Sequence, residues 1–252
     1  MADPAGKVTI VTGAGSGIGA AAARLLGARG HAVALVARRP EPLAEVAAAI
    51  TAAGGRALAI PADLADPAAP ALIVERTVAA FGAISGLVNN AATIKTMPLA
   101  DYPLAVLDEH WAVNIRAPFL LTQAALPWLL QSRGAVVNVS SSSGTIVRPG
   151  QSLYGMTKAA LEYLTKSFAG ELSRQGVRVN AIAYGPVDTP IHRSWATDLA
   201  AAYAWLKDQV PLGRIGTADE AAWFIGLLLS DEAGWLTGVV LPVDGGQALD
   251  IA

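Results

Sequence analysis

Hydrophobic positions along the chain form short continuous runs of Val, Ile, Leu and Ala rather than strict alternation with polar positions. Such runs are typical of parallel strands with both faces buried. Longer alanine- and leucine-rich stretches of helical length separate them. We predict strands over residues 8–12, 32–37, 56–61, 86–89, 135–140, 178–184 and 239–243. We predict helices over residues 18–29, 42–53, 68–81, 107–131, 154–175 and 218–230.

Strands that alternate with helices indicate an α/β protein, because each helix returns the chain for the next parallel strand. The pattern predicts a doubly wound, seven-stranded parallel sheet, the Rossmann fold. The 252 residues contain no Gly/Ser/Pro-rich linker, charge run or repeat, so we expect a single domain over residues 1–252. Asp66 is the expected N-cap of the third helix, and Gly82 is its expected stop.

One segment, residues 190–211, departs from this alternation. It follows the sixth strand and contains Trp195, Tyr203 and Trp205. Ligands of open α/β sheets bind at the carboxyl ends of strands, so this segment is expected to cover a substrate site. The alternative is a solvent-facing helical excursion whose aromatic side chains pack on the core.

Composition narrows the class of protein. The chain is 53% hydrophobic and 15% charged, which excludes a disordered chain, and its net charge of −2 indicates no nucleic-acid or membrane partner. It has no cysteine, which excludes disulfides, a cysteine nucleophile and thiolate metal sites and fits the cytoplasm. We expect no signal peptide, no membrane helix and, because His31, His110 and His192 lack ligand spacing, no metal.

A glycine-rich turn follows the first predicted strand and opens the first helix. Gly13, Gly17 and Gly19 are spaced G-x-x-x-G-x-G, with Ser16 and Ile18 between them. Glycine lets the backbone approach a pyrophosphate, and a helix N-terminus offers it unpaired N–H groups. Turns also collect glycine for other reasons, but this position between strand and helix predicts a dinucleotide-binding turn.

Tyr154 and Lys158 are four residues apart and therefore share one face of a helix. The pair alone could be an ordinary surface pair, but Ser141 lies 13 residues before Tyr154 at the end of a predicted strand, a spacing that resembles that of the short-chain dehydrogenase/reductase family. Reducing a ketone requires a hydride on carbon and a proton on oxygen. Tyr154 would supply the proton, Ser141 would hold the oxygen, and the Lys158 ammonium and an oxidised nicotinamide would lower the tyrosine pKa.

Together, the glycine turn, Asn89-Asn90-Ala91-Ala92 after the fourth strand and Tyr154-x-x-x-Lys158 resemble the short-chain dehydrogenase/reductase family. The resemblance covers residues 7–246 and points to the single-domain branch with its 3-oxoacyl-ACP-reductase-like members. It implies an oxidoreductase that acts on CH–OH or C=O groups with Tyr154 as general acid/base. It also implies a homotetramer, or at least a dimer, packed in part through residues 242–246.

The resemblance assigns roles to further residues. Lys158 would hydrogen-bond the nicotinamide ribose, and Asn114 would hold a water beside it. The remaining matched cofactor positions are Asp63 and Leu64 at the adenine, Val187 and Thr189 at the carboxamide, and Asn90, Ala91 and Ala92 after the fourth strand. Tyr184 departs from the family pattern, where proline is usual, and puts the wall beside the nicotinamide in doubt.

Arg38 and Arg39 end the second strand, after Ala37 at the position where family NAD enzymes carry Asp. Guanidinium groups suit a 2′-phosphate, so we expect NADP(H), with NAD(H) as the alternative. Two observations oppose this: both arginines could be solvated loop charges, and Ser16 stands where many NADP-preferring relatives carry Arg or Lys.

Ser143 and Gln151 are the expected polar substrate contacts. We expect an uncharged ketone or secondary alcohol, while Arg148 and Arg193 stay open as partners of a carboxylate. The alternative function is a catalytically silent dinucleotide-binding sensor or scaffold of the same fold.

Overall fold

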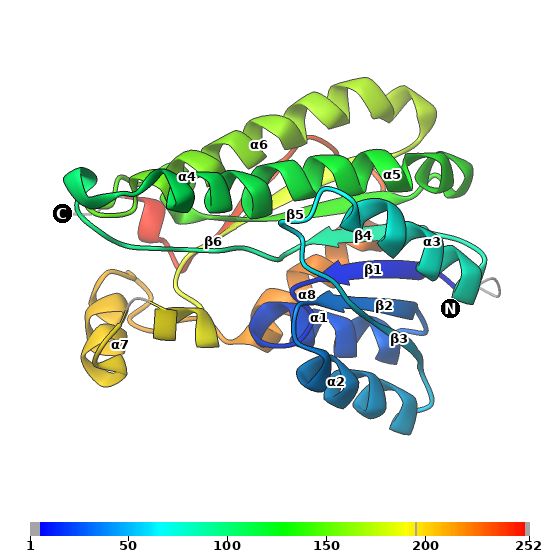
Figure 1. The fold of residues 1–252 in the computed structure, drawn as a ribbon, viewed down its shortest axis with the longest axis horizontal. Helices are drawn as coiled ribbons and strands as arrows, with labels where there is room; N and C mark the ends of the chain where they lie inside the picture. Colours follow the sequence, from blue (N-terminus) through cyan, green and yellow to red (C-terminus); the bar gives the residue numbers. More distant parts are fainter. Residues whose placement is uncertain (1–5, 195, 250–252) are drawn as a thin grey trace.

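The computed structural model describes residues 6–194 and 196–249, and Trp195 therefore lies outside the described residues. Its centre is a seven-stranded sheet in the order β3-β2-β1-β4-β5-β6-β7, with every neighbouring pair parallel (Figure 1). The strands are β1 (Val8–Thr12), β2 (Ala32–Ala37), β3 (Arg56–Pro61), β4 (Gly86–Asn89), β5 (Ala135–Ser141), β6 (Arg178–Tyr184) and β7 (Val240–Val243). The predicted doubly wound parallel sheet is confirmed.

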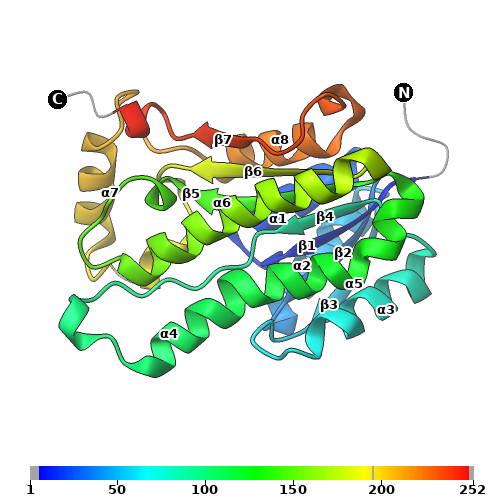
Figure 2. The ribbon, with the colours of Figure 1, turned by 90° about the horizontal axis from the view of Figure 1, so that it is seen from above.

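Helices cover both faces of the sheet (Figures 1 and 2). One face carries α1 (Gly17–Ala28), α2 (Pro40–Ala52) and α8 (Ala218–Leu229). The other carries α3 (Ala69–Phe81), α4 (Leu104–Trp111), α5 (Ala117–Ser132) and α6 (Ser152–Leu172). Short helical turns are η1 (Leu99–Asp101), η3 (Ser142–Gly144), η4 (Ser173–Gln175), η6 (Asp231–Ala233) and η7 (Gln247–Leu249).

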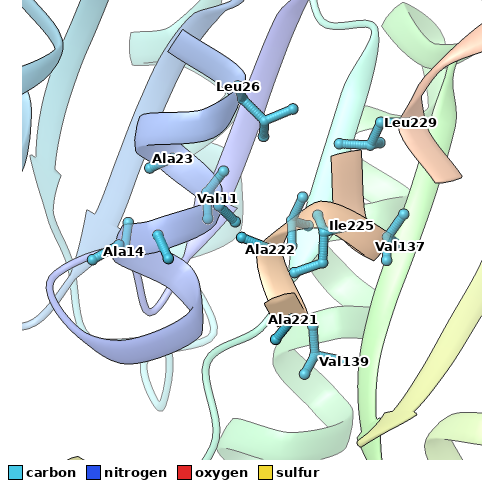
Figure 3. Packing of buried hydrophobic residues seen from close by; sticks show 14 of the residues in the cluster. Val11, Ala14, Ala23, Leu26, Val137, Val139, Ala221, Ala222, Ile225 and Leu229 are labelled. Carbon is cyan, nitrogen blue, oxygen red and sulfur yellow. The ribbon is translucent and has the colours of Figure 1, made fainter. Parts of the chain in front are cut away.

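The hydrophobic core explains why the strand sequences do not alternate. On one face, Val11 of β1 and Val137 of β5 belong to the same buried cluster as Leu26 of α1 and Ile225 of α8 (Figure 3). All five residues of β1 are buried. A strand covered by helices on both faces has no solvent side on which to place polar residues.

The predicted helix over residues 107–131 is wrong in one respect, because the chain forms two α-helices there. A π-helical turn, η2 (Ala112–Arg116), lies between α4 and α5, and the Ala117 N–H bonds to the Ala112 carbonyl. Such turns are frequent at functional sites, and this one carries Asn114. Hydrophobic periodicity cannot detect a single widened turn.

The expected N-cap of the third helix is also wrong. Asp66 instead accepts a hydrogen bond from the Ala68 N–H within a turn, and α3 begins at Ala69 with Ala68 at its N-cap. Gly82 ends the helix as predicted, in the left-handed conformation at φ 79°. Glycine takes that conformation without a Cβ clash.

The segment over residues 190–211 forms η5 (Pro190–Ser194) and α7 (Leu199–Asp208), and it lies beyond the carboxyl end of β6 (Figure 1). Asp198 caps α7 by accepting hydrogen bonds from the Ala200 and Ala201 N–H groups. Within the described residues, no helix combines the length and hydropathy needed to span a bilayer.

Candidate active site

The strand order reverses between β1 and β4, and ligands of open α/β sheets bind in the crevice at such a reversal. The glycine-rich turn lies there. Gly13 has a positive φ of 66°, and a Cβ on it would approach the Ala91 Cα to 3.0 Å. Ser16, the exposed N-cap of α1, makes no side-chain cap, so the first N–H groups of the helix stay available to an anion.

Hydrogen bonds from the end of β4 hold this turn in place. The Thr12 hydroxyl accepts from the Asn90 N–H at 2.9 Å and from the Ala91 N–H at 3.0 Å. The Asn90 side-chain amide donates to the Thr12 carbonyl at 2.8 Å. The Asn90 side chain therefore braces the phosphate turn. Sequence reasoning missed Thr12, because no motif spacing marks the residue before the first glycine.

The predicted phosphate turn and nicotinamide loop come together in space. A Cβ on Gly17 would lie 3.1 Å from Cγ2 of Thr189, and the Thr189 hydroxyl donates to the Val187 carbonyl at 3.3 Å. Val187 is buried, and Ile18 packs against the same core cluster. A cofactor that contacted both segments would therefore bind where the glycine turn meets the loop after β6.

At the end of β2, Arg38 and Arg39 are both exposed. Neither guanidinium has a hydrogen-bond or ion-pair partner among the described residues. Nearby, after β3, Leu64 is buried, while Oδ1 of Asp63 accepts a hydrogen bond from the Ala65 N–H at 2.9 Å. The arginines are thus free to bind a phosphate.

Helix α6 places Tyr154 and Lys158 on its buried face. The Lys158 ammonium lies 5.5 Å from the centroid of the Tyr154 ring and donates to the Val139 carbonyl at 2.7 Å. Only 2% of Lys158 and 8% of Tyr154 is exposed. The surface-pair alternative is therefore excluded by burial.

The electrostatics of the pair differ from the sequence-based expectation. Burial raises the pKa of Tyr154 to about 12, and a hydrogen bond with Ser141 opposes that rise. Burial also lowers the pKa of Lys158 to about 8, and the charge of Glu162 opposes that fall. Among the protein's own groups, burial outweighs the opposing effect of Ser141, so the tyrosine pKa is raised in the chain without its nicotinamide.

Ser141 ends β5, and its hydroxyl accepts a hydrogen bond from the Ser143 N–H at 3.2 Å. The Ser143 hydroxyl in turn donates to Oε1 of Gln151 at 3.1 Å. These two predicted substrate contacts border a hollow of about 260 Å³, which is also lined by Arg148 and Met156. The hollow lies along the loop between β5 and α6, and Tyr154, Lys158 and Ser141 are not among the residues that line it.

Asn114 projects from the π-helical turn and is buried. Its side-chain oxygen accepts from the Thr93 N–H at 2.8 Å, and its amide donates to the Thr93 carbonyl and to the Thr157 hydroxyl, both at 3.0 Å. The Thr157 hydroxyl donates to the Tyr154 carbonyl at 2.8 Å. Asn114 thus connects the loop after β4 to α6. Sequence reasoning missed Thr157, although it directly precedes Lys158.

Tyr184, at the position where proline was expected, turns away from this edge. Its side chain is buried in the cluster beneath α8, and its hydroxyl donates to the Ala221 carbonyl. Burial raises the pKa of this phenol. Tyr184 therefore anchors the end of β6 to the first turn of α8.

No group of His, Asp or Glu side chains among the described residues could hold a metal ion. This edge of the sheet offers a buried phenol beside a buried ammonium, hydroxyl and amide groups, and a glycine-rich turn at a helix N-terminus.

Comparison with known proteins places these features in a family. A family profile described as enoyl-(acyl carrier protein) reductase matches residues 13–248. The chain is similar to cis-4-hydroxycyclohexanecarboxylate dehydrogenase of Sinomonas cyclohexanicum, with 37% identity over 95% of this chain and 96% of the relative. It is also similar to 2,5-dichloro-2,5-cyclohexadiene-1,4-diol dehydrogenase of Sphingobium indicum, with 36% identity over 98% of both chains.

A solved structure shows the same fold. The short-chain dehydrogenase of Burkholderia cenocepacia in complex with NADP is 36% identical, with a TM-score of 0.89 over 96% of this chain and 97% of that one. These similarities extend over at least 95% of this chain, and therefore over the sheet and the helices that cover it. The chain belongs to the short-chain dehydrogenase/reductase family.

Proposed function

We propose that the protein is an NAD(P)(H)-dependent oxidoreductase that interconverts a ketone and a secondary alcohol, with Tyr154 as general acid/base. The observation that carries this proposal is the burial of Tyr154 and Lys158 together, with the ammonium 5.5 Å from the centroid of the phenol ring. A protein that only bound a dinucleotide would have no use for a buried ammonium beside a phenol, since burying either group costs free energy.

In the direction of reduction, the Tyr154 hydroxyl gives its proton to the substrate oxygen as charge develops there, and the Ser141 hydroxyl donates a hydrogen bond to the same oxygen. The nicotinamide, when bound, supplies or accepts the hydride. The Lys158 ammonium stabilises the phenolate that remains and would donate to the nicotinamide ribose. The amide N–H groups of Asn114 are occupied by Thr93 and Thr157, and its Oδ1 accepts from the Thr93 N–H, so the second lone pair of Oδ1 would accept from a water on the proton path.

We propose NADP(H) as the preferred cofactor, with NAD(H) as the alternative. The unpaired guanidinium groups of Arg38 and Arg39, and the absence of a carboxylate at Ala37, support this preference. The glycine turn supports dinucleotide binding in general, because the absence of Cβ atoms at Gly13 and Gly19 lets it pack tightly on Asn90 and Ala91 at the start of α1. The solved structure of the Burkholderia cenocepacia relative contains NADP, which agrees with the proposal.

For the substrate, we propose a small secondary alcohol or its ketone, carried on a six-membered ring. Two relatives are named for ring alcohols, one neutral and one bearing a carboxylate. Ser143 and Gln151, which follow Ser141 between β5 and α6, would supply polar contacts, and Arg148 lies on the same loop. The segment over residues 190–211, with α7, would cover the bound substrate.

We also propose a homotetramer. Exposed apolar side chains occur at Trp111 of α4 and Phe119 of α5, and also at Trp223 of α8 and Leu249 of η7. A tetramer with two-fold axes needs more than one kind of contact between copies, and exposed apolar side chains on several elements would support such contacts. Light scattering would measure the assembly, and cell fractionation would test the predicted cytoplasmic location.

The test of the function is turnover by the purified protein. NADPH and NADH are each offered with a panel of cyclic ketones, and the oxidised forms with the matching alcohols, while nicotinamide absorbance is followed. Tyr154→Phe should lose activity by at least about 10³-fold and still bind cofactor. Tyr163→Phe, on the same helix with 76% of the tyrosine exposed, is the control and should behave as wild type. Cofactor binding without any turnover would favour the silent sensor.

A further inference from the structure

Glu162 is a buried acid that the proposed reaction does not use. It lies on α6, one helical turn after Lys158, and only 8% of it is exposed. Its Oε1 accepts a hydrogen bond of 2.7 Å from the hydroxyl of Ser140, the residue before Ser141. Its carboxylate forms no ion pair within 4.0 Å among the described residues, so its position has no simple salt-bridge explanation.

The fold leaves space for this carboxylate at the loop that follows Ser141. A Cβ on Gly144 would lie only 2.7 Å from Oε1 of Glu162 and 3.2 Å from the Ala159 backbone nitrogen. The loop therefore packs onto α6 at Glu162 because residue 144 has no side chain. The carboxylate is held between the end of β5 and the helix that carries the catalytic pair.

A buried carboxylate needs compensation, because a charge removed from water without a positive partner is strongly unfavourable. The group that can supply it is the Lys158 ammonium on the same helix. The titratable groups of α6 that face Lys158 are Tyr154 and Glu162. Among the described residues, the contacts that β5 makes with Lys158 are neutral: the ammonium donates to the Val139 carbonyl, and the Lys158 carbonyl accepts from the Ser140 hydroxyl. In η2, Asn114 bonds to Thr157, and Arg116 donates to the Ala65 carbonyl.

Desolvation alone would lower the pKa of Lys158, so that the lysine would lose its proton at a lower pH than an exposed lysine does. Burial lowers the lysine pKa to about 8, and Glu162 is the charge that opposes this fall. The field of a carboxylate one helical turn away acts in this direction through a low-dielectric interior, where screening is weak. The effect therefore does not require direct contact between the two groups.

We propose that Glu162 is a positioning residue that keeps Lys158 protonated and, through Ser140, fixes the end of β5 that carries Ser141. Its effect on catalysis rests on the proposed function of Tyr154 and Lys158. Its effect on the charge of Lys158 does not, and the two can be measured separately.

Three variants separate charge from packing. Glu162→Gln keeps an oxygen that can accept from Ser140 but removes the charge. Ser140→Ala keeps the charge and removes the hydrogen bond. Glu171→Gln, also on α6 but exposed, is the matched control.

The readout is the titration of Lys158, followed by NMR of protein carrying carbon-13 at lysine Cε. The chain has five lysines, so Lys158→Met identifies the resonance. Glu162→Gln should lower the Lys158 pKa by at least about half a unit, whereas Ser140→Ala and Glu171→Gln should leave it in place. In pH profiles of kcat/KM, the alkaline limb should move to lower pH in Glu162→Gln only.

An unchanged Lys158 titration in Glu162→Gln would overturn the proposal. Should that variant fail to fold, the carboxyl carbon of Glu162 in the wild type decides the matter, because the proposal requires its ionised shift at neutral pH and a protonated carboxyl refutes it. If the wild type shows no turnover, the proposed function fails, while the lysine titration still tests the role of Glu162.

Discussion

The hydroxyl of Tyr203 donates a hydrogen bond of 2.6 Å to Oδ1 of Asp188. This contact joins α7 to the loop between the predicted nicotinamide residues Val187 and Thr189. The Tyr203 ring also meets His192 edge-on, with centroids 5.4 Å apart, and Nε2 of His192 lies 2.8 Å from the Val187 carbonyl. The segment that would cover the substrate is thus fastened to the loop that would hold the nicotinamide.

Tyr203→Phe should loosen this attachment while keeping the ring contact with His192. A hydrogen bond to a carboxylate contributes about 1–2 kcal/mol, so we expect roughly a fivefold to thirtyfold rise in KM for the cofactor and faster proteolysis within residues 190–211. Steady-state kinetics and limited proteolysis measure both. The control is again Tyr163→Phe, and equal proteolysis of the two variants would contradict the proposed attachment.

Arg38→Asp should change the choice of cofactor. The substitution removes a guanidinium that would pair with the 2′-phosphate and adds a carboxylate that repels it but accepts from ribose hydroxyls. We expect Kd for NADPH to rise at least about tenfold relative to Kd for NADH, measured by fluorescence titration. Arg174→Asp reverses an exposed charge elsewhere and should leave Kd for NADPH and Kd for NADH unchanged. An equal loss for both cofactors would remove the role assigned to Arg38.

The strands and the shared helix face of Tyr154 and Lys158 could be predicted from the sequence because each has a local cause. Continuous apolar runs predicted β1 and β6 at their observed bounds, and the four-residue spacing of Tyr154 and Lys158 predicted that both lie on one face of α6. What could not be predicted depends on contacts between distant segments. The π-helical turn, the bracing of Gly13 by Asn90 and the rise of the Tyr154 pKa all arise from packing that no window of sequence contains.

Tyr184 is a second residue whose packing could not be predicted from the sequence. The substitution for proline could be found in the sequence, but the destination of its side chain could not. The ring lies in the core against α8, so its effect on the nicotinamide wall is indirect, through the position of the β6 end.

His31 should make stability depend on pH. Burial, and then the charges of Lys7 and Arg29, lower its pKa from 6.5 to about 4, and Nδ1 lies 2.8 Å from the Thr9 hydroxyl. Between pH 6.5 and about pH 4, the unfolded chain binds a proton at His31 and the folded chain does not. Protonation therefore favours the unfolded chain, and the free energy of unfolding falls as pH falls through this window. In His31→Asn, the free energy of unfolding in urea should fall less steeply across the window. A slope as steep as that of the wild type would contradict the assignment.

Gly19 and Gly170 provide a matched pair of glycines within helices. A Cβ on Gly19 would lie 2.8 Å from the Gly13 carbonyl carbon and 2.5 Å from Nδ2 of Asn90, so it would push α1 away from the turn that Asn90 braces. Because the first of these neighbours is backbone, Gly19→Ala should destabilise the fold by about 1–3 kcal/mol and weaken dinucleotide binding.

Gly170 is exposed on α6 with nothing within 4 Å of such a Cβ. Gly170→Ala should therefore stabilise the fold by up to about 1 kcal/mol, the gain in helix propensity, without changing cofactor affinity. Urea unfolding and cofactor titration of both variants check the pair. Opposite signs are required, since a loss of stability in both would mean that the helices simply do not tolerate alanine and that the close approach at Gly13 is not the cause.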